Sequence, residues 1–264
     1  MFRVGIFDSG LGGLTTLCAI IDKIYNIEIY YIADTIHAPY GDKTQNEILK
    51  YSISITDYLI LNHNIDALIV ACNSATAYSI NHLRIHYPHL IIIGTEPAIK
   101  PAFKQTKTNN IALLATKATI NGDKYNTLSS SLSKDRDVNI YNIACIGLVE
   151  LIENGEIDSD ETKKLLAKLL EPMKENNIDT IVLGCTHYPL IKHHIEDIMN
   201  DKVNIIDSKE AISSYLLKKI IDKGHYNIGD IKINIFYTGN IKIDMINNII
   251  NRNKTISKID IVTN

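Results

Sequence analysis

The sequence is poor in cysteine, and the few cysteines that it has lie far apart. Its 264 residues contain Cys18, Cys72, Cys145 and Cys185, and no two of them form a Cys-x-x-Cys pair. This spacing excludes the disulfide framework of a small secreted domain and a zinc knuckle, both of which need closely spaced cysteines. We therefore expect four reduced thiols and no locally built metal site.

Targeting signals and long apolar runs are also lacking. The first residues, MFRVGIFDSG, have neither the apolar segment nor the cleavage site of a signal peptide. No apolar run approaches the roughly 18 residues that a membrane-spanning helix needs. We expect a cytoplasmic protein without a membrane partner.

An excess of positive charge is lacking as well. The formal net charge is −3, and the Lys and Arg residues are scattered without a basic block. Nucleic acids bind to concentrated positive charge, so no nucleic-acid partner is expected. With 45% hydrophobic residues the chain can bury a sizeable core. The partner that we expect is a small molecule, and we leave a homodimer open.

A glycine-rich loop near the start of the chain lacks the last glycine of a nucleotide-binding fingerprint. Residues 2–7 are predicted as a strand and residues 8–13 as a tight loop before a helix. Gly10 and Gly12 are not followed by a third glycine three residues on, so no nucleotide cofactor is expected. The N–H groups of such a loop can hold a carboxylate or a phosphate, or Asp8 can simply cap the helix.

The sequence does contain a long repeat. Residues 65–75, IDALIVACNSA, and residues 178–188, IDTIVLGCTHY, both begin with Ile-Asp, continue as an apolar run and end at a cysteine followed by polar residues. Such a run is typical of a strand buried on both faces of a parallel sheet. Residues 46–64 and 161–177, just before, have the pattern of amphipathic helices ended by Asn. The repeat predicts an α/β fold with two related helix–strand–cysteine units.

The prolines predict where the chain divides. Pro97 and Pro101 follow the predicted strand 90–94, which suggests a crossing between two lobes. The elements after residue 206 are expected to return to the first lobe. We therefore predict a first lobe of residues 1–97 and 207–264 and a second lobe of residues 98–206, each with a mainly parallel sheet.

Two of the cysteines are candidates for proton transfer. Cys72 and Cys185 each follow a predicted parallel strand, at the sheet edge where ligands bind in α/β folds. In two facing lobes they would lie across one cleft. Two thiols on opposite faces of a bound carbon can remove a proton from one side and donate one to the other, which inverts a stereocentre. Asp8 and His187 are the neighbours that we expect to tune them.

Structural alternatives apply to each of these residues. Cys18 and Cys145 are expected to be core residues, because free cysteine behaves as a small buried hydrophobe. A zinc site of Cys72, Cys185 and His187 is an alternative to the two-thiol pair, although we expect no metal. Tyr40 either packs or contacts a ligand.

Four motifs in this order resemble the signature of the glutamate racemase family. They are DSGLGGL at residues 8–14, PYG at 39–41, ACNSA at 71–75 and GCTHYP at 184–189. Together they cover nearly the whole chain. The resemblance implies a cofactor-independent isomerase that interconverts L- and D-glutamate and supplies D-glutamate for peptidoglycan. It also implies two pseudo-symmetric α/β lobes with the active site in the cleft between them.

The same resemblance implies roles for individual residues. Cys72 and Cys185 become the proton-transfer residues, and Glu153 assists near Cys185. The residues implied to line the substrate site are Asp8, Ser9, Tyr40, Gly41, Asn73, Ser74, Thr186 and His187.

Two other functions remain open at this point. An aspartate racemase or another two-cysteine member of the superfamily would use the same thiols, because they act at Cα whatever the side chain. A non-catalytic amino-acid-binding protein would have the same two-lobed fold, but it would have no need for two equivalent thiols.

Overall fold

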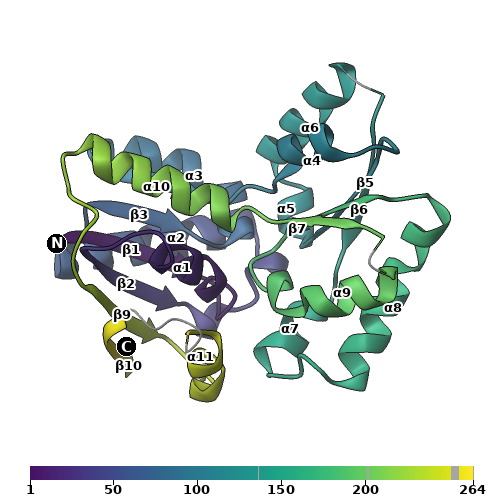
Figure 1. The fold of residues 1–264 in the computed structure, drawn as a ribbon. Helices are drawn as coiled ribbons and strands as arrows, with labels where there is room; N and C mark the ends of the chain where they lie inside the picture. The colour runs from purple at the N-terminus through teal and green to yellow at the C-terminus, as the bar shows by residue number, and fades with distance from the viewer. Residues whose placement is uncertain (136, 201, 251–255, 264) are drawn as a thin grey trace.

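The computed structural model describes residues 1–135, 137–200, 202–250 and 256–263, which form two parallel sheets (Figure 1). One sheet has six strands in the order β10-β9-β2-β1-β3-β4, and the other has four in the order β6-β5-β7-β8. The strands of the first are β1 Phe2–Asp8, β2 Ile27–Ala33, β3 Ala67–Val70, β4 Ile91–Gly94, β9 Ile231–Tyr237 and β10 Ile256–Thr263. Those of the second are β5 Asn110–Ala115, β6 Asn139–Ala144, β7 Thr180–Gly184 and β8 Asn204–Ile206.

The two strands of the sequence repeat are buried on both faces. In β3, Leu68 and Val70 belong to one hydrophobic cluster and Ala67 and Ile69 to another, on the opposite face of the sheet. Every residue of β7 is likewise buried. A strand covered on both faces needs apolar side chains at every position, which is why these strands lack the alternating pattern of a surface sheet.

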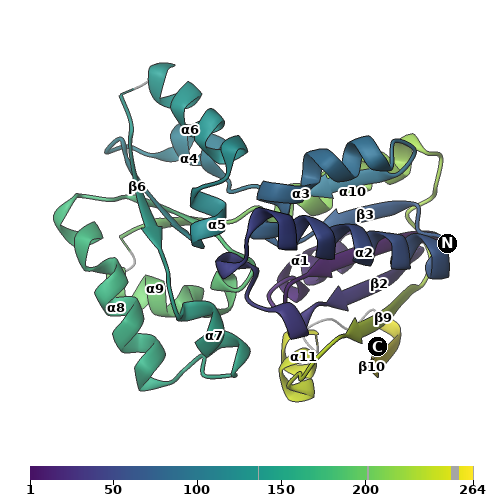
Figure 2. The same cartoon turned by 180° about the vertical axis from the view of Figure 1, so that it is seen from behind.

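Helices cover both faces of each sheet. On the six-stranded sheet, α1 (Leu14–Ile21), α10 (Lys209–Asp222) and α11 (Ile243–Ile250) share one hydrophobic cluster, and α2 (Gln45–His63) and α3 (Asn73–His86) share the other (Figures 1 and 2). On the four-stranded sheet the corresponding layers are α7 (Leu148–Glu153), α8 (Asp160–Glu175) and α9 (Lys192–Met199) against α4 (Ile99–Gln105) and α6 (Asp123–Asp135). No helix in these described ranges is both long enough and apolar enough to pass through a membrane.

The two sheets repeat one topology, as the sequence repeat predicts. The order β2-β1-β3-β4 in the first matches β6-β5-β7-β8 in the second. Helices α2 and α8 are followed by Asn64 and Asn177, which have positive φ of 48° and 50°. Asp66 then accepts a hydrogen bond from the N–H of Arg3 (2.8 Å), and Asp179 accepts from two N–H groups just before β5. The repeated Asn-Ile-Asp is therefore a connection that ends a helix and ties the next strand to its neighbour.

The chain passes between the sheets twice, after β4 and after β8. We call the six-stranded sheet with its helices the first lobe and the four-stranded sheet with its helices the second lobe. Figure 1 shows the N-terminus and the C-terminal segment on the first lobe. The division at residues 97/98 and 206/207 stays a prediction, and the two connections leading to α4 and α10 fall at those positions.

Candidate active site

Both repeat cysteines lie at the carboxyl ends of their strands, where the two lobes face each other. Cys72 follows β3 and Cys185 follows β7, and their side chains are 5% and 7% exposed. Burial raises the pKa of the Cys72 thiol, and the negative charges of Asp8 and, less strongly, of Cys185 raise it further. Cys72 is therefore held as a neutral thiol that can donate a proton.

Cys72 is fixed by the loop after β1 and by the helix that it begins. Its Sγ lies 3.7 Å from the hydroxyl oxygen of Ser9 and accepts a hydrogen bond from the N–H of Ala75 at 3.4 Å. Cys72 is thus the N-cap of α3, with its sulfur over the first turn of the helix. A helix N-terminus stabilises negative charge, so this position tolerates the thiolate that forms once the proton has left.

Cys185 has a different partner. Its Sγ lies 3.6 Å from Nδ1 of His187, whose Nε2 makes a short contact with Oε1 of Glu153. Burial alone lowers the pKa of His187, but the interactions with Cys185 and Glu153 outweigh burial and hold this pKa well above its ordinary value. Burial raises the pKa of Glu153, and the interaction with His187 outweighs it and lowers that pKa. His187 is therefore held as an imidazolium between the sulfur of Cys185 and the carboxylate of Glu153.

The N–H groups of the glycine loop after β1 donate hydrogen bonds to carboxylates of the protein itself. Oδ2 of Asp8 accepts from the N–H of Gly13 (2.9 Å) and Gly10 (3.4 Å), and Oε1 of Glu153 accepts from the N–H of Leu11 (2.6 Å). The N–H groups that can hold a carboxylate or a phosphate are thus taken here by the protein's own carboxylates, those of Asp8 and Glu153. Asp8 accepts from the N–H of Gly13, the N-cap residue of α1, and from no N–H group within that helix, every residue of which the structure describes.

Two glycines of this loop are required by close approach to the second lobe. A Cβ on Gly10 would lie 2.0 Å from Oε1 of Glu153, and one on Gly12 would lie 2.6 Å from Nδ1 of His187. The N–H of Gly12 is 3.3 Å from Nε2 of His187. Because that nitrogen gives its own proton to Glu153, we interpret this as a close contact and not as a hydrogen bond. The loop can meet the second lobe only without side chains at these positions.

Tyr40 is held by Asp34, a residue that the sequence interpretation missed. Tyr40 lies in the short helix η2 (Tyr40–Asp42) and is fully buried, with its hydroxyl donating to Oδ2 of Asp34 at 2.5 Å. Oδ1 of Asp34 also accepts from Thr238 (2.8 Å), and His37 contacts the same carboxylate. Asp34 follows β2 just as Asp8 ends β1, so its position after a buried strand was the available signal.

Ser74 and Thr186, which come soon after the two cysteines, make contacts across the cleft. Oγ of Ser74 is 2.8 Å from Oγ1 of Thr116, which caps the short helix α5 (Lys117–Ile120) at the end of β5. Oγ1 of Thr186 lies 3.4 Å from both carboxylate oxygens of Asp8. Asn73 turns its amide to the carbonyl of Thr95 in the first lobe at 3.1 Å. Thr116 was not among the predicted site residues, although it follows its strand as Ser9 follows β1.

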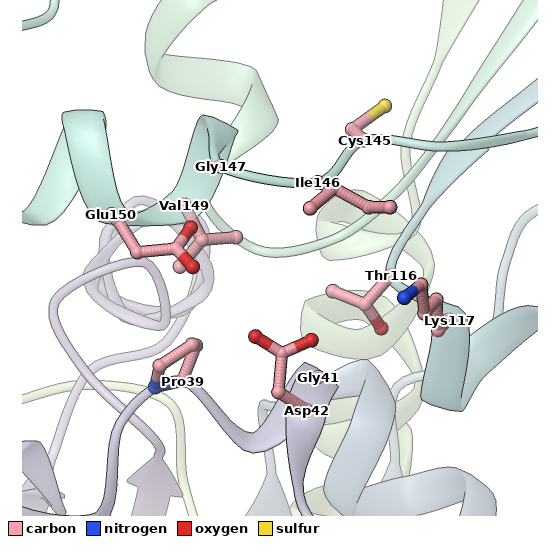
Figure 3. Close-up of a pocket in the computed structure, with 10 residues that line it drawn as sticks. All are labelled: Pro39, Gly41, Asp42, Thr116, Lys117, Cys145, Ile146, Gly147, Val149 and Glu150. Atoms are coloured by element: carbon pink, nitrogen blue, oxygen red, sulfur yellow. The ribbon is translucent and has the colours of Figure 1, made fainter.

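Only a small space lies between the lobes beside Gly41. Figure 3 shows Pro39 and Asp42 on the first lobe facing Thr116, Ile146 and Glu150 on the second. The cavity that they line is about 20 Å³, enough for one water molecule. A Cβ on Gly41 would lie 2.8 Å from the Cβ of Thr116. The lobes are therefore closed on each other here, and a ligand of several carbon atoms enters this space only when they separate.

The other two cysteines differ from each other. Cys145 is 4% exposed and belongs to the core of the second lobe, as predicted. The prediction that Cys18 is a core residue is wrong, because its side chain is half-buried and its Sγ donates to the carbonyl of Ile249 at 3.4 Å. On the short helix α1 the deeper positions are taken by Leu14 and Leu17, which leaves Cys18 on the border of the buried face.

Comparison with known proteins adds the family to this geometry. Residues 27–215 match the family model described as Asp/Glu/Hydantoin racemase. The chain belongs to this racemase family. A glutamate racemase of Aliarcobacter butzleri is 52% identical over 260 residues, which are 98% of this chain and 100% of that protein.

Solved structures of the family have the same fold. A glutamate racemase from Bacillus anthracis superposes with a TM-score of 0.82 at 30% identity, covering 99% of this chain and 97% of the other. A glutamate racemase from Francisella tularensis in complex with D-glutamate gives 0.81 at 25% identity, with coverage of 99% and 97%. The expected α/β fold with two lobes is thereby confirmed.

Proposed function

We propose that this protein interconverts L- and D-glutamate by proton transfer at Cα, with Cys72 and Cys185 as the two acid–base groups. The activity is that of the glutamate racemases to which the chain is similar over nearly its full length. One observation carries the assignment of the thiols: they occupy equivalent positions in two lobes of the same topology, at the strand ends that face each other. A carbon held between them meets one sulfur on each face.

The surroundings of the two thiols support a defined exchange. For one enantiomer, the thiolate of Cys185 takes the Cα proton, so that an S–H bond forms as the C–H bond breaks. The neutral thiol of Cys72 then donates its proton to the opposite face, and its sulfur is left as a thiolate over the N-terminus of α3. For the other enantiomer the two sulfurs exchange roles. The imidazolium of His187 balances the charge of Cys185, and Glu153 holds that imidazolium in place.

The remaining predicted site residues have supporting roles in this proposal. Ser9 contacts Cys72, while Thr186 and Asp8 contact each other across the cleft. Gly41 forms the wall opposite Thr116, Tyr40 anchors the same short helix on Asp34, and Asn73 and Ser74 form the start of α3. We expect these groups to bind the carboxylates and the ammonium group of glutamate once the lobes have separated to admit it. No metal or organic cofactor has a part in the proposed transfer.

We further propose where the protein works and how it assembles. D-Glutamate is a building block of peptidoglycan, and its synthesis in the cytoplasm fits a chain whose four cysteines lie far apart in the sequence. Exposed apolar side chains on α10 and just after it support a homodimer: Tyr215, Ile221, Tyr226 and Ile228 are 49%, 56%, 81% and 83% exposed. Light scattering at several concentrations tests the dimer.

Racemisation in D2O tests the two-thiol assignment. Because the proton that is delivered comes from a thiol that has exchanged with solvent, the first D-glutamate formed from L-glutamate should carry deuterium at Cα while unreacted L-glutamate stays protonated. Cys72→Ala and Cys185→Ala should each lose racemisation by roughly 10²-fold or more. Cys18→Ala, which alters a half-buried thiol outside the cleft, is the matched control and should keep it. Protonated early product, or near-normal activity in either active-site variant, would refute the assignment.

A further inference from the structure

A second group of metal-ligating side chains lies outside the candidate active site, on the second lobe. Asp158 lies in the connection between α7 and α8, and His193 and His194 are adjacent residues at the start of α9. One ligand atom from each lies within 4.8 Å of the other two. We propose that Asp158, His193 and His194 form a surface binding site for a divalent transition cation of the zinc type.

The distances between the ligand atoms support a metal site. Nε2 of His193 is 3.3 Å and Nε2 of His194 is 3.0 Å from Oδ1 of Asp158. Ligands about 2.0–2.1 Å from a tetrahedral zinc ion lie about 3.3 Å from one another. The two imidazole rings are tilted by 47° with centroids 3.9 Å apart, and Nε2 of each ring faces the same carboxylate oxygen. An ion therefore fits among the three atoms with small side-chain rotations.

The ligand types select the class of cation. Two imidazoles and one carboxylate suit zinc, nickel or cobalt, whereas calcium and magnesium prefer oxygen ligands alone. The side chain of His194 is only 9% exposed and gives the site a fixed anchor, while those of His193 and Asp158 are 53% and 76% exposed and can adjust. Lys192, the neighbouring cation on α9, is paired with Glu196 at 3.4 Å, which lessens its repulsion of an incoming ion.

The position of the site relates it to the candidate active site. Asp158 comes five residues after Glu153 (158 − 153), and His193 comes six residues after His187 (193 − 187). The segment of residues 148–158 and the segment of residues 185–194 therefore meet twice, at the Glu153–His187 pair inside the cleft and at this cluster on the surface. An ion bound at the outer meeting point would hold together the two segments that carry the inner one. The part that the inner pair plays in catalysis rests on the proposed function, whereas the binding of the ion and the clamping of the two segments do not.

Titration of the purified protein with Co²⁺ tests the site. We expect one Co²⁺ ion to bind per chain. Its visible absorption bands should be those of cobalt with a low coordination number, and the near ultraviolet should show no thiolate-to-cobalt charge-transfer band. Asp158→Asn and His193→Gln should each weaken binding at least 10-fold, the lower end of the loss when a supporting group of a metal site is removed. Both positions are exposed, so these variants should fold.

Two matched controls locate the metal. Cys185→Ala removes an active-site thiol, and His82→Gln removes one of two exposed imidazoles four residues apart on α3; both should bind Co²⁺ as the unaltered protein does. A thiolate-to-cobalt band, or loss of Co²⁺ binding in Cys185→Ala, would show that the ion binds in the cleft. Loss of Co²⁺ binding in His82→Gln would show that the ion binds on α3. Absence of binding to the unaltered protein would leave only a hydrogen-bonded cluster, and each of these three results overturns the proposal.

Hydrogen exchange tests the link between the two meeting points. Saturating Zn²⁺ should slow amide exchange in peptides covering residues 148–158 and 185–194, and His193→Gln should abolish the effect. Unchanged exchange despite stoichiometric binding would refute the clamping role. Because this readout does not depend on racemisation, it separates a failure of the metal site from a failure of the proposed catalytic function.

Discussion

His187 is the residue on which the charge balance of the second lobe depends. It is 2% exposed, and its ring lies between the sulfur of Cys185 and the carboxylate of Glu153. A buried cation is costly unless it is paired, so the charged form of His187 depends on those two partners. Replacement of Cys185 or Glu153 should therefore change the protonation of His187 even in a variant that keeps the fold.

The Glu153–His187 pair predicts a pH window of stability. The pKa of His187 is raised from 6.5, so its contribution is complete below 6.5 and is lost as the pH rises through the folded-state value. The pKa of Glu153 is lowered from 4.5, so its contribution is complete above 4.5 and is lost as the pH falls through the folded-state value. The free energy of unfolding of the unaltered protein should exceed that of Glu153→Gln, and this difference should be largest between pH 4.5 and 6.5.

Urea unfolding of both proteins from pH 4 to pH 9 measures this difference. Glu175→Gln, at the exposed end of α8, is the control for the loss of one negative charge and should differ little from the unaltered protein at any pH. A difference for Glu153→Gln that grows steadily towards pH 9 would contradict the ion pair.

Residues whose role comes from local sequence were predictable, and residues whose role comes from distant contacts were not. Cys72 and Cys185 stand out because both follow apolar strands and are themselves followed by polar residues. Thr116 gains its role through Ser74, 42 residues away, which the fold brings to it. The residues next to Cys18 could not predict its hydrogen bond to Ile249, because that contact joins segments more than 200 residues apart.

At the scale of elements, the loop between β1 and α1 is the most constrained segment of the candidate site. Gly10→Ala should lower the rate of racemisation on the order of 10²-fold. Its Cβ would lie 2.0 Å from Oε1 of Glu153, so the loop has to shift, and a shift of about 1 Å in a catalytic site can cost such a factor. The kinetic constants of the variant measure this loss.

Gly224→Ala is the matched control for that substitution. Gly224 has a φ of +78°, and an added Cβ would meet no atom within 4 Å. It should lose about 1 kcal/mol of stability through the left-handed backbone and keep its racemisation rate. Equal losses of activity in the two variants would show that the glycine loop has no special role.

Most elements were predictable almost to their ends, because their patterns are strong, whereas α4 (Ile99–Gln105) lies where only a crossing between the lobes was expected. The expected strand of residues 2–7 is Phe2–Asp8, and the helical pattern of residues 161–177 is the helix Asp160–Glu175, which is followed by Asn. The loop after β1 was predicted in position but not in function, since the Glu153 carboxylate that takes the N–H of Leu11 comes from 142 residues away.

At the scale of the whole molecule, ligand binding should stabilise the closed arrangement of the lobes. A ligand at ~100 times its dissociation constant adds about 2.7 kcal/mol, which for a chain of this size raises the melting temperature by roughly 5–10 °C. L- or D-glutamate should give this rise, and aspartate a smaller one. Differential scanning fluorimetry measures both, and equal shifts would contradict glutamate as the substrate.

Removal of metals should leave catalysis unchanged. The proposed transfer uses two sulfurs, a histidine and a glutamate, and the cluster of Asp158, His193 and His194 lies outside the cleft. Dialysis against EDTA should therefore preserve the rate of racemisation, measured by polarimetry. A loss that zinc restores, and that persists in His193→Gln, would place a metal on Cys72, Cys185 and His187 instead.

The order of strands in the first lobe has a consequence for the synthesis of the chain. β2 pairs with β1 on one side and with β9 on the other, and β9 begins 198 residues after β2 ends (231 − 33). At ~5–20 residues per second, a ribosome needs about 10–40 s to make that stretch. During this interval the second lobe is made and can fold, while the edge of β2 has no partner and is open to pairing with other chains. The growing protein is thus most prone to aggregation shortly before its last strands emerge, and chains ended before Ile231 should be the ones that chaperones retain.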